Sequence, residues 1–372
     1  MTTERIDLSA YKEDNSFYKP FKLLITIKSF DLKAIRERYL KNKNKKSNRT
    51  GSVNRRETAM GGIAEVTIKN GYIENLEILA KMPEPRGVDS TEEVTAFSSE
   101  DKVHVVNEKT LKTITNPWFS YIHTVDIDKN SKNRLLVSSS GFDCIFEYRI
   151  DEQQQLFEWF AWENGFEQGL DPETGAELFL TRNKETAAQY KASGKKCLFI
   201  SDPANQVLPT AKRAAFINSV VYDPINENNI IATFFHEGAV YQMNKQTGEA
   251  TRVLKGLNNP HGGMKNGKND FMATSTRSGE IVTGNLDSEK RFWFENLEGK
   301  PEMLGDMEWV QNTKLMEGHF IAIDSNRNVF FIIDPVNELI SPVAYDPNWA
   351  VQDLVISQLK EDQKYMIRNL QG

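Results

Sequence analysis

Three of the five histidines in this sequence fall where a shared strand pattern would gather them on one face of the molecule. They are His123, His236 and His261. A neutral imidazole can act near pH 7 as a base, a nucleophile or a metal ligand, so a cluster indicates chemistry more strongly than one histidine does. Asn218 occurs in the same pattern and would orient a substrate. These four residues form the predicted catalytic set. The alternative for each histidine is a structural hydrogen bond to a neighbouring part of the fold.

Arginines and amides accompany these histidines. Guanidinium groups beside imidazoles suit a sulfuryl, phosphoryl or carboxylate group, because they stabilise developing negative charge. The alternative for each arginine is a surface ion pair. Aromatic side chains such as Trp162 lie just before a long insertion. If they line a pocket beneath it, they would favour a substrate with an apolar part. The predicted substrate-binding residues are Arg86, Gln311, Gln352, Arg277, Arg327, Thr276 and Trp162.

These residues favour metal-free transferase, lyase or cyclase chemistry on a small organic molecule that is anionic or aromatic, in the biosynthesis of a specialised metabolite. No cofactor is expected. One alternative is a non-catalytic protein that binds a ligand or another protein on the same face. A second is a divalent metal on the central axis, with His123, His236, His261 and His319 as its ligands. Calcium or magnesium would instead use Asp324, Glu237 and Asn218.

The elements that must position these residues form a repeat of roughly 40 to 50 residues, a period typical of propellers. Its landmark is an apolar strand, a polar turn and a second strand. Four segments match: LLVSSSGFDCIFEYRI from Leu135, IIATFFHEGAVYQMNK from Ile230, FMATSTRSGEIVTGNL from Phe271 and HFIAIDSNRNVFFIID from His319. All are rich in β-branched and aromatic residues, which favours strands. The sequence therefore predicts an all-β chain folded as a single β-propeller domain over residues 1–372.

A further short strand precedes each pair, and its first residue is polar every time. In a propeller the first strand of a blade is innermost and lines the channel. The six openings should then form one ring at one channel mouth: Arg86, His123, Asn218, His261, Gln311 and Gln352. The turns between second and third strands should lie on the same face, with Ser140, His236, Glu237, Thr276, Arg277, Asp324, Asn326 and Arg327.

Two insertions also map to this face. Residues 31–57 hold ten Lys or Arg against three acids and are expected to form a basic loop, either mobile in solvent or drawing anions to the mouth. Residues 165–215 are expected to form a lid with a short helix that opens at Asn183.

Six blades are preferred and seven are the alternative. A seventh would have to lie within residues 165–215, where only KCLFIS reads as a strand. At the closure, VQDLVISQL and KYMIRNL near the C-terminus add two strands and the N-terminus adds three, which is one strand more than a blade needs. One of them should lie at an edge or outside the ring.

The segments SYIHTVDID, INSVVYD, NNPHGG and the TGE turn resemble arylsulfotransferase-like and NHL (streptogramin-lyase-like) β-propellers. In those families a His or Asn opens the inner strand and a Gly-rich or TG turn follows the outer ones. The resemblance covers roughly Arg86 to Asp346. It implies that His123 and His261 face the substrate, assisted by Asn218 and Arg277. The chain departs from the arylsulfotransferases because it shows neither an export signal nor room for their N-terminal β-sandwich.

Composition excludes several classes. The net charge of −6 gives no reason to expect nucleic acid, and no aromatic residues interleave the basic stretch. The first residues lack an apolar h-region and no run of 18 apolar residues occurs, so we expect a cytoplasmic protein without a membrane partner. Cys144 and Cys197 are too few for a disulfide framework and should be unpaired. A monomer or weak dimer is expected.

Overall fold

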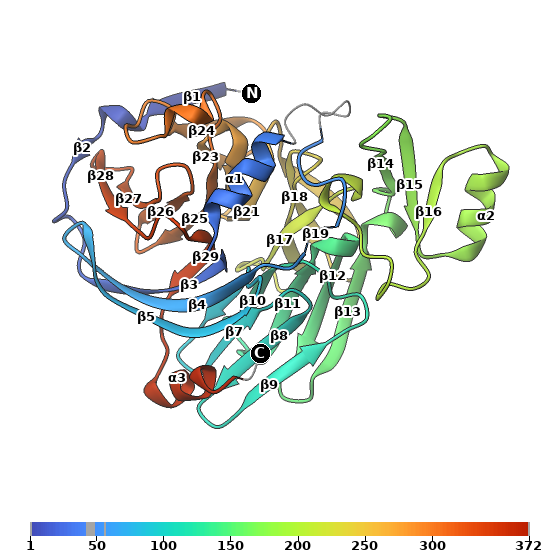
Figure 1. Ribbon diagram of the computed structural model, residues 1–372, viewed down its shortest axis with the longest axis horizontal. Coiled ribbons are helices and arrows are strands. Elements are labelled where there is room, and N and C mark those ends of the chain that lie inside the picture. Colours follow the sequence, from blue (N-terminus) through green and yellow to red (C-terminus); the bar gives the residue numbers. More distant parts are fainter. Residues whose placement is uncertain (1, 42–48, 56, 371–372) are drawn as a thin grey trace.

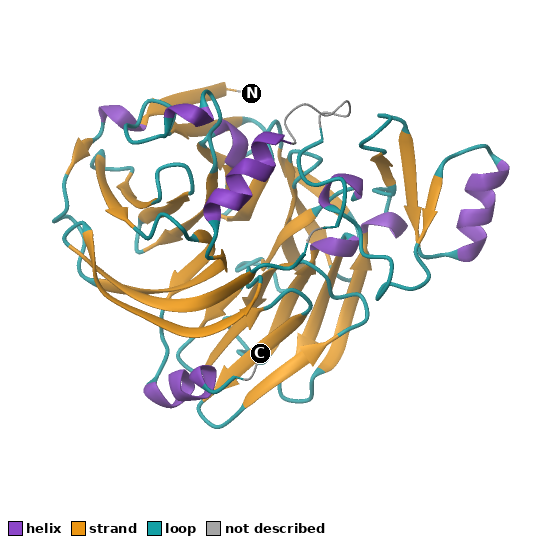
Figure 2. Cartoon of the chain, in the orientation of Figure 1, coloured by secondary structure: helices purple, strands orange, loops and turns teal. Residues whose placement is uncertain are grey.

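The computed structural model describes residues 2–41, 49–55 and 57–370. Strands dominate it, as the orange ribbons of Figure 2 show. They form six sheets of four or five strands and one sheet of three. In the larger sheets consecutive strands pair in antiparallel fashion, so each sheet is a meander in chain order.

Two of these sheets precede the large insertion. The first holds β6 (Val88–Ser90), β7 (Val94–Ser98), β8 (Lys102–Asn107) and β9 (Leu111–Thr115). The second holds β10 (Ile122–Ile127), β11 (Arg134–Ser139), β12 (Cys144–Arg149) and β13 (Gln154–Phe160).

Three sheets follow it. The first holds β17 (Ile217–Tyr222), β18 (Asn229–Phe234), β19 (Ala239–Asn244) and β20 (Ala250–Leu254). The second holds β21 (Pro260–Lys265), β22 (Phe271–Ser275), β23 (Glu280–Gly284) and β24 (Ser288–Trp293), with β1 (Thr2–Asp7) parallel to β24. The third holds β25 (Val310–Met316), β26 (His319–Asp324), β27 (Val329–Asp334) and β28 (Leu339–Ala344), with β2 (Lys12–Glu13) parallel to β28.

The two ends of the chain meet in the sixth sheet. Strand β29 (Ala350–Ile356) pairs with β3 (Phe21–Ser29), which continues through β4 (Met60–Lys69) to β5 (Tyr72–Pro83). The sequence predicted one strand too many where the two ends of the chain meet, and the structure accounts for the excess in two ways. Strands β1 and β2 lie on the outer edges of two other sheets, and KYMIRNL is not a strand. It belongs to helix α3 (Glu361–Arg368), which has acids in its first turn and Arg368 in its last, a charge order that favours a helix.

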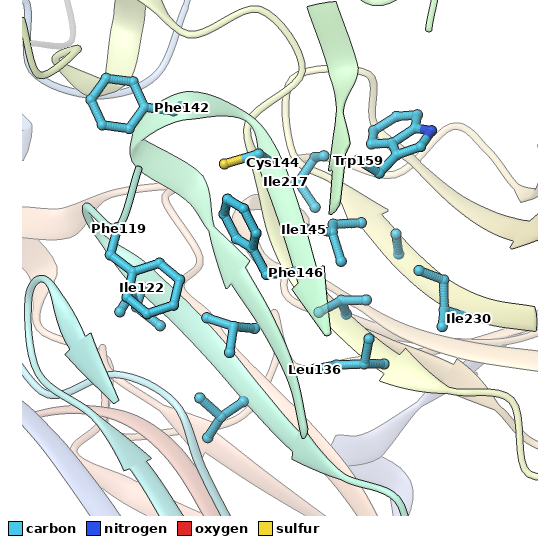
Figure 3. Close-up of a cluster of buried hydrophobic side chains, with 14 of the residues drawn as sticks. Phe119, Ile122, Leu136, Phe142, Cys144, Ile145, Phe146, Trp159, Ile217 and Ile230 are labelled. Atoms are coloured by element: carbon cyan, nitrogen blue, oxygen red, sulfur yellow. The ribbon is translucent and has the colours of Figure 1, made fainter. Parts of the chain in front are cut away.

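The first strands of the six sheets contact one another in cyclic order. Strand β6 contacts β10, followed by β17, β21, β25 and β29, and β29 contacts β6 again. This closed arrangement is a β-propeller, and the predicted fold is confirmed. The second strands of several sheets are buried along almost their whole length, so both of their faces pack against other parts of the fold. Figure 3 shows one buried cluster between the β10–β13 and β17–β20 sheets, which includes Phe146, Trp159 and Ile217.

The turns between second and third strands tighten through left-handed residues. Asp143, Gly279 and Asn328 have φ of 53°, 64° and 58°. Asp, Asn and Gly tolerate this region best, as the sequence pattern indicated. Six 3₁₀ turns connect the elements: Leu8–Ala10, Ser140–Phe142, Ala161–Glu163, Thr210–Lys212, Thr276–Ser278 and Glu302–Leu304.

The two insertions differ in form. The basic segment is not a loop throughout, because it begins as helix α1 (Leu32–Lys41). Its residues 42–48 and 56 lie outside the described part of the chain. The second insertion forms a small sheet of β14 (Gln168–Leu170), β15 (Glu177–Thr181) and β16 (Cys197–Phe199) with helix α2 (Lys184–Ala192), whose N-cap is Asn183. Figure 1 shows this small sheet and α2 projecting to one side.

Both cysteines are free thiols, so the predicted lack of a disulfide is confirmed. Cys144 is buried in β12, and Cys197 is half-buried in β16. Within residues 2–41, 49–55 and 57–370, no helix has both the length and the apolar character that a membrane crossing needs.

Candidate functional site

Four of the six predicted ring residues share one structural feature at the start of the inner strands. The strand ladder skips His123, Asn218, Gln311 and Gln352, each of which sits in a register shift without a pairing partner. A bulge frees a side chain from the alternation of its strand and re-aims it, and bulges occur often beside active sites. The repeated bulge therefore sets the direction of these four side chains independently of the strand alternation.

A second repeated feature is a positive backbone φ two residues before four of the six ring residues. Glu84, Tyr121, Phe216 and Asn259 have φ of 40°, 50°, 51° and 53°, although none is glycine. Non-glycine residues adopt this region rarely, and such strain tends to accumulate at functional sites. Each of these residues precedes a ring residue by two positions, so the turn that enters the inner strand is the same in four sheets.

A cavity of about 620 Å³ opens at this end of the channel. Five of the six predicted ring residues line it, together with the predicted Arg277. Its described lining consists of Lys28, Ile35, Arg38, Arg49, Thr50, Gly51, Ser52, Arg86, Tyr121, His123, Thr210, Arg213, Phe216, Phe235, Asn258, His261, Arg277, Trp309, Gln311 and Gln352.

Two histidines meet in this cavity. The ring centroids of His123 and His261 are 5.3 Å apart. Nδ1 of His261 lies 2.8 Å from the hydroxyl of Thr276. That contact, together with a hydrogen bond to the backbone of Asn259, fixes the ring of His261. Aromatic side chains enclose the pair, with Phe216 5.9 Å from His123 and Phe235 5.5 Å from His261.

Both imidazoles are neutral over the physiological range. Burial, reinforced by Lys28, lowers the pKa of His261 to about 3. Burial lowers the pKa of His123 well below its ordinary value, with smaller contributions from His261, Arg86, Lys28 and Arg213. A neutral imidazole has a free lone pair and can accept a proton, as a general base must.

The charge of the lining has one sign. Six of the described lining residues are cationic, and no described lining residue is Asp or Glu. The cations are Lys28, Arg38, Arg49, Arg86, Arg213 and Arg277. In a chain whose net charge is −6, this is a local concentration of positive charge that cannot come from overall composition. The cavity therefore favours anions.

Arg86 lies between two buried carboxylates. It forms ion pairs with Glu84 and, at 3.0 Å, with Glu100. Although burial lowers it, the two carboxylates raise the pKa of Arg86 above its ordinary value. Its guanidinium carbon lies 4.4 Å from the ring centroid of Tyr121. Arg86 is thus held rigidly at the cavity wall with most of its charge compensated.

Part of the basic segment covers the cavity. Arg49 donates to the backbone carbonyls of Arg213 and Ala214. The hydroxyl of Thr50 donates to Oδ1 of Asn259 at 2.9 Å, and the carbonyl of Ser52 accepts from the backbone of Ala211 at 3.1 Å. These contacts fix residues 49–52 over the mouth.

The predicted lid of residues 165–215 is placed differently from the expectation. Of its residues only Thr210 and Arg213 line the cavity. The small sheet and α2 stand at the side of the molecule (Figure 1). The reason is that β14–β16 pair with one another, which lets this segment fold away from the mouth.

Two predicted catalytic residues do not line the cavity. Asn218 is fully buried and its amide donates to the carbonyl of Pro260 at 2.8 Å, so it ties two inner strands together. His236 lies 3.1 Å through Nε2 from the carbonyl of Thr210. Burial, with help from Arg49, lowers the pKa of His236 to about 3. Asn218 and His236 therefore have structural hydrogen bonds outside the described cavity lining.

Three predicted substrate-binding residues also have structural partners instead. Thr276 contacts His261, as described above. The indole of Trp162 donates to Oδ2 of Asp143 at 3.1 Å within the core. Arg327 pairs with Glu308 and Asp324 and donates to the carbonyls of Phe294 and Leu297. The sequence placed these residues near the correct face but could not show which neighbours would use their polar groups.

The four histidines of the metal alternative do not converge. His319 pairs with Met316 at one end of β26, while Gln311 lies at the opposite end of β25. Nε2 of His319 is 3.8 Å from Oδ2 of Asp334. Asp324, required for a calcium site, is occupied by Arg327. Within the described part of the chain no group of three His, Cys, Asp or Glu has the arrangement of a metal site.

Several lining residues were not predicted. Tyr121, Phe216 and Trp309 stand two positions before His123, Asn218 and Gln311, so the register that found the ring also contained their signal. Arg213, Phe235 and Lys28 lie outside that register, and nothing in the sequence pattern singles them out.

No family model and no curated protein matches this sequence. Among solved structures, a chain of the nidogen/laminin complex has a TM-score of 0.53 at 8% identity, covering 90% of this chain and 97% of that one. A protein of unknown function from Bacteroides caccae has a TM-score of 0.51 at 13% identity, covering 90% and 98%. Virginiamycin B lyase from Staphylococcus aureus reaches only 0.43 at 9% identity, covering 71% of each chain. The first two likenesses support the fold alone.

Proposed function

We propose that this protein is a six-bladed propeller enzyme that acts on a small organic anion in the cavity at the channel mouth. Each of the six larger sheets is one blade, and the three-stranded sheet is an appendage. The observation that carries the proposal is the adjacency of His123 and His261, 5.3 Å apart, in a cavity whose described lining holds six cations and no acid.

The chemistry follows from the roles that these groups can take. One neutral imidazole removes a proton from the bound molecule and becomes an imidazolium. The imidazolium then returns this proton to the leaving or rearranged group, while the second imidazole stays neutral. Arg277 lines the cavity from the turn that also carries Thr276, and it stabilises negative charge that develops on the substrate. Transfer, elimination and ring closure all use such a pair, and a place in the biosynthesis of a specialised metabolite would suit them.

The overhanging residues 49–52 strengthen this arrangement. A covered cavity excludes water, and electrostatic interactions are stronger where water is excluded. The volume of about 620 Å³ suits a small molecule rather than a folded partner. The rival function, a non-catalytic receptor for the same anion, would use the cations but would not need two histidines side by side.

The test compares the natural chain with the H123Q/H261Q double variant. Each protein is incubated with a fractionated extract of small organic anions, and the mixture is followed by mass spectrometry. We expect one compound to disappear and a product to form with the natural chain only. Retention of a compound without conversion would favour the receptor function. Equal conversion by the double variant would exclude the histidine mechanism.

The control for this test is the H319Q variant. His319 is half-buried at the other end of its strand and lies outside the described cavity lining. Its replacement should leave turnover unchanged, so a loss in H319Q as large as that in the double variant would point to instability rather than catalysis.

A further inference from the structure

Three arginine side chains are almost wholly buried, and their partners differ. Arg86 has Glu84 and Glu100, and Arg327 has Glu308 and Asp324. Arg213 is 0% exposed and forms no ion pair with a carboxylate of the described residues. Its Nη2 donates to the carbonyl of Leu208 at 3.3 Å, while Nε and Nη1 have no hydrogen-bond partner. Two buried arginines are thus compensated and one is not.

The surroundings of Arg213 hold it in place without neutralising it. Its guanidinium carbon lies 4.2 Å from the ring centroid of Tyr121 and 4.7 Å from that of Phe216. Cation–π contacts of this kind offset only part of the cost of burying a charge. Burial lowers the pKa of Arg213 to about 10, so the group is still a cation at neutral pH.

Two nearby carboxylates, those of Asp143 and Glu100, raise the pKa of Arg213, but both are already engaged. Asp143 accepts from the indole of Trp162 and from the backbone N–H groups of Ala214 and Phe216. Glu100 pairs with Arg86 at 3.0 Å. The other charged residues that line the cavity repel Arg213, because all of them are cations. An unsatisfied buried cation in a native structure calls for an explanation, and a missing anion is the direct one.

We propose that Arg213 is the anion receptor of this cavity and that the ligand class is a small carboxylate attached to a flat apolar group. The carboxylate would lie against Arg213, where it supplies the absent negative charge. The flat group would pack on the aromatic lining residues Phe216, Phe235 and Trp309. This inference rests on the proposed function in one respect, since it names the substrate class of the same cavity.

The binding test uses benzoate and benzamide, which have nearly the same shape but differ in charge. Isothermal titration calorimetry of the full chain should show that benzoate binds about tenfold or more tightly than benzamide. The R213Q variant should lose this preference, and R213K should keep part of it. The K184Q variant, changed at an exposed position of α2, should behave as the natural chain does.

Three results would overturn the proposal. Equal affinity for the two probes, or no benzoate binding at millimolar concentration, would show that the cavity does not select a carboxylate. An unchanged preference in R213Q would assign the selection to another cation. Inorganic phosphate that binds as tightly as benzoate would remove the flat apolar group from the ligand class.

A second measurement needs no ligand. Replacing an uncompensated buried cation by methionine should stabilise the free protein, whereas replacing a compensated one should destabilise it. We expect the melting temperature of R213M to rise by about 2 °C or more and that of R86M to fall. Failure of R86M to fold agrees with this expectation. A fall in R213M, or its failure to fold, would show that the charge of Arg213 is already matched and would overturn the proposal.

The two proposals can fail separately. Benzoate selection that depends on Arg213 in a protein without any turnover would leave this inference standing and remove the proposed enzyme. Turnover that requires His123 and His261, with no role of Arg213 in selecting benzoate, would do the reverse.

Discussion

The ring centroids of His123 and His261 lie 5.3 Å apart, although the two residues belong to strands that are not neighbours. In the cycle of inner strands, β17 lies between β10, which holds His123, and β21, which holds His261. The residue of β17 at the same register is Asn218, and its amide turns to the carbonyl of Pro260.

This approach predicts electrostatic coupling between the two rings. The pKa of His123 is lowered chiefly by burial and next by His261. In the H261Q variant the pKa of His123 should therefore rise, while remaining below its ordinary value because burial persists. A histidine NMR titration measures it. An unchanged pKa would mean that the rings do not influence each other in solution.

Thr276 should position His261 rather than bind substrate. Its hydroxyl is 2.8 Å from Nδ1 of that ring. In T276V the tautomers of His261 should become mixed, and in T276S one tautomer should persist. Nitrogen chemical shifts of the imidazole distinguish these states. The same single tautomer in T276V as in the natural chain would contradict this role.

The buried histidines make stability depend on pH. The folded pKa is about 4 for His104 and about 3 for His236 and His261, against 6.5 for an exposed histidine. Below pH 6.5 the unfolded chain binds more protons than the folded one, so stability falls as the pH falls. Each such histidine contributes a slope of about 1.4 kcal/mol per pH unit.

The H104Q variant tests this slope outside the cavity. His104 contacts Thr113 and is absent from the cavity lining. Its replacement should reduce the proton uptake on unfolding near pH 5 by about one proton. Urea unfolding at several pH values measures the uptake, and an identical slope in H104Q would refute the assignment.

Arg327 should be structural. Its replacement by methionine leaves Asp324 buried without a cation and leaves Glu308 with Lys300 alone, which should cost about 3 to 5 kcal/mol of unfolding free energy. Denaturant unfolding of R327M measures the loss. A loss below about 1 kcal/mol would mean that these carboxylates find other partners.

The fold and the shared register of the inner strands could be predicted because both are written as a repeat. Strand periodicity placed Arg86, His123 and His261 at one mouth, and all three line the cavity. The repeat also contains Tyr121 and Phe216, but both are aromatic, and the pattern singles out the first polar residue of each inner strand.

What the repeat cannot encode is which polar groups find partners. Asn218 shares the register of His123, yet its amide is used by a neighbouring strand. Nothing in the local sequence distinguishes Arg327 from Arg213. Arg327 forms ion pairs with Glu308 and Asp324, whereas Nε and Nη1 of Arg213 have no hydrogen-bond partner among the described residues. Such differences arise from contacts between segments far apart in the chain, which no local pattern shows.

One NMR titration tests most directly whether the cavity between His123 and His261 is the ligand site. The five histidines of the chain serve as reporters while benzoate is added to the natural protein. We predict that the signals of His123 and His261 shift together with a single dissociation constant, while those of His104 and His319 stay in place. Equal shifts at all positions, or none at His123 and His261, would contradict the account.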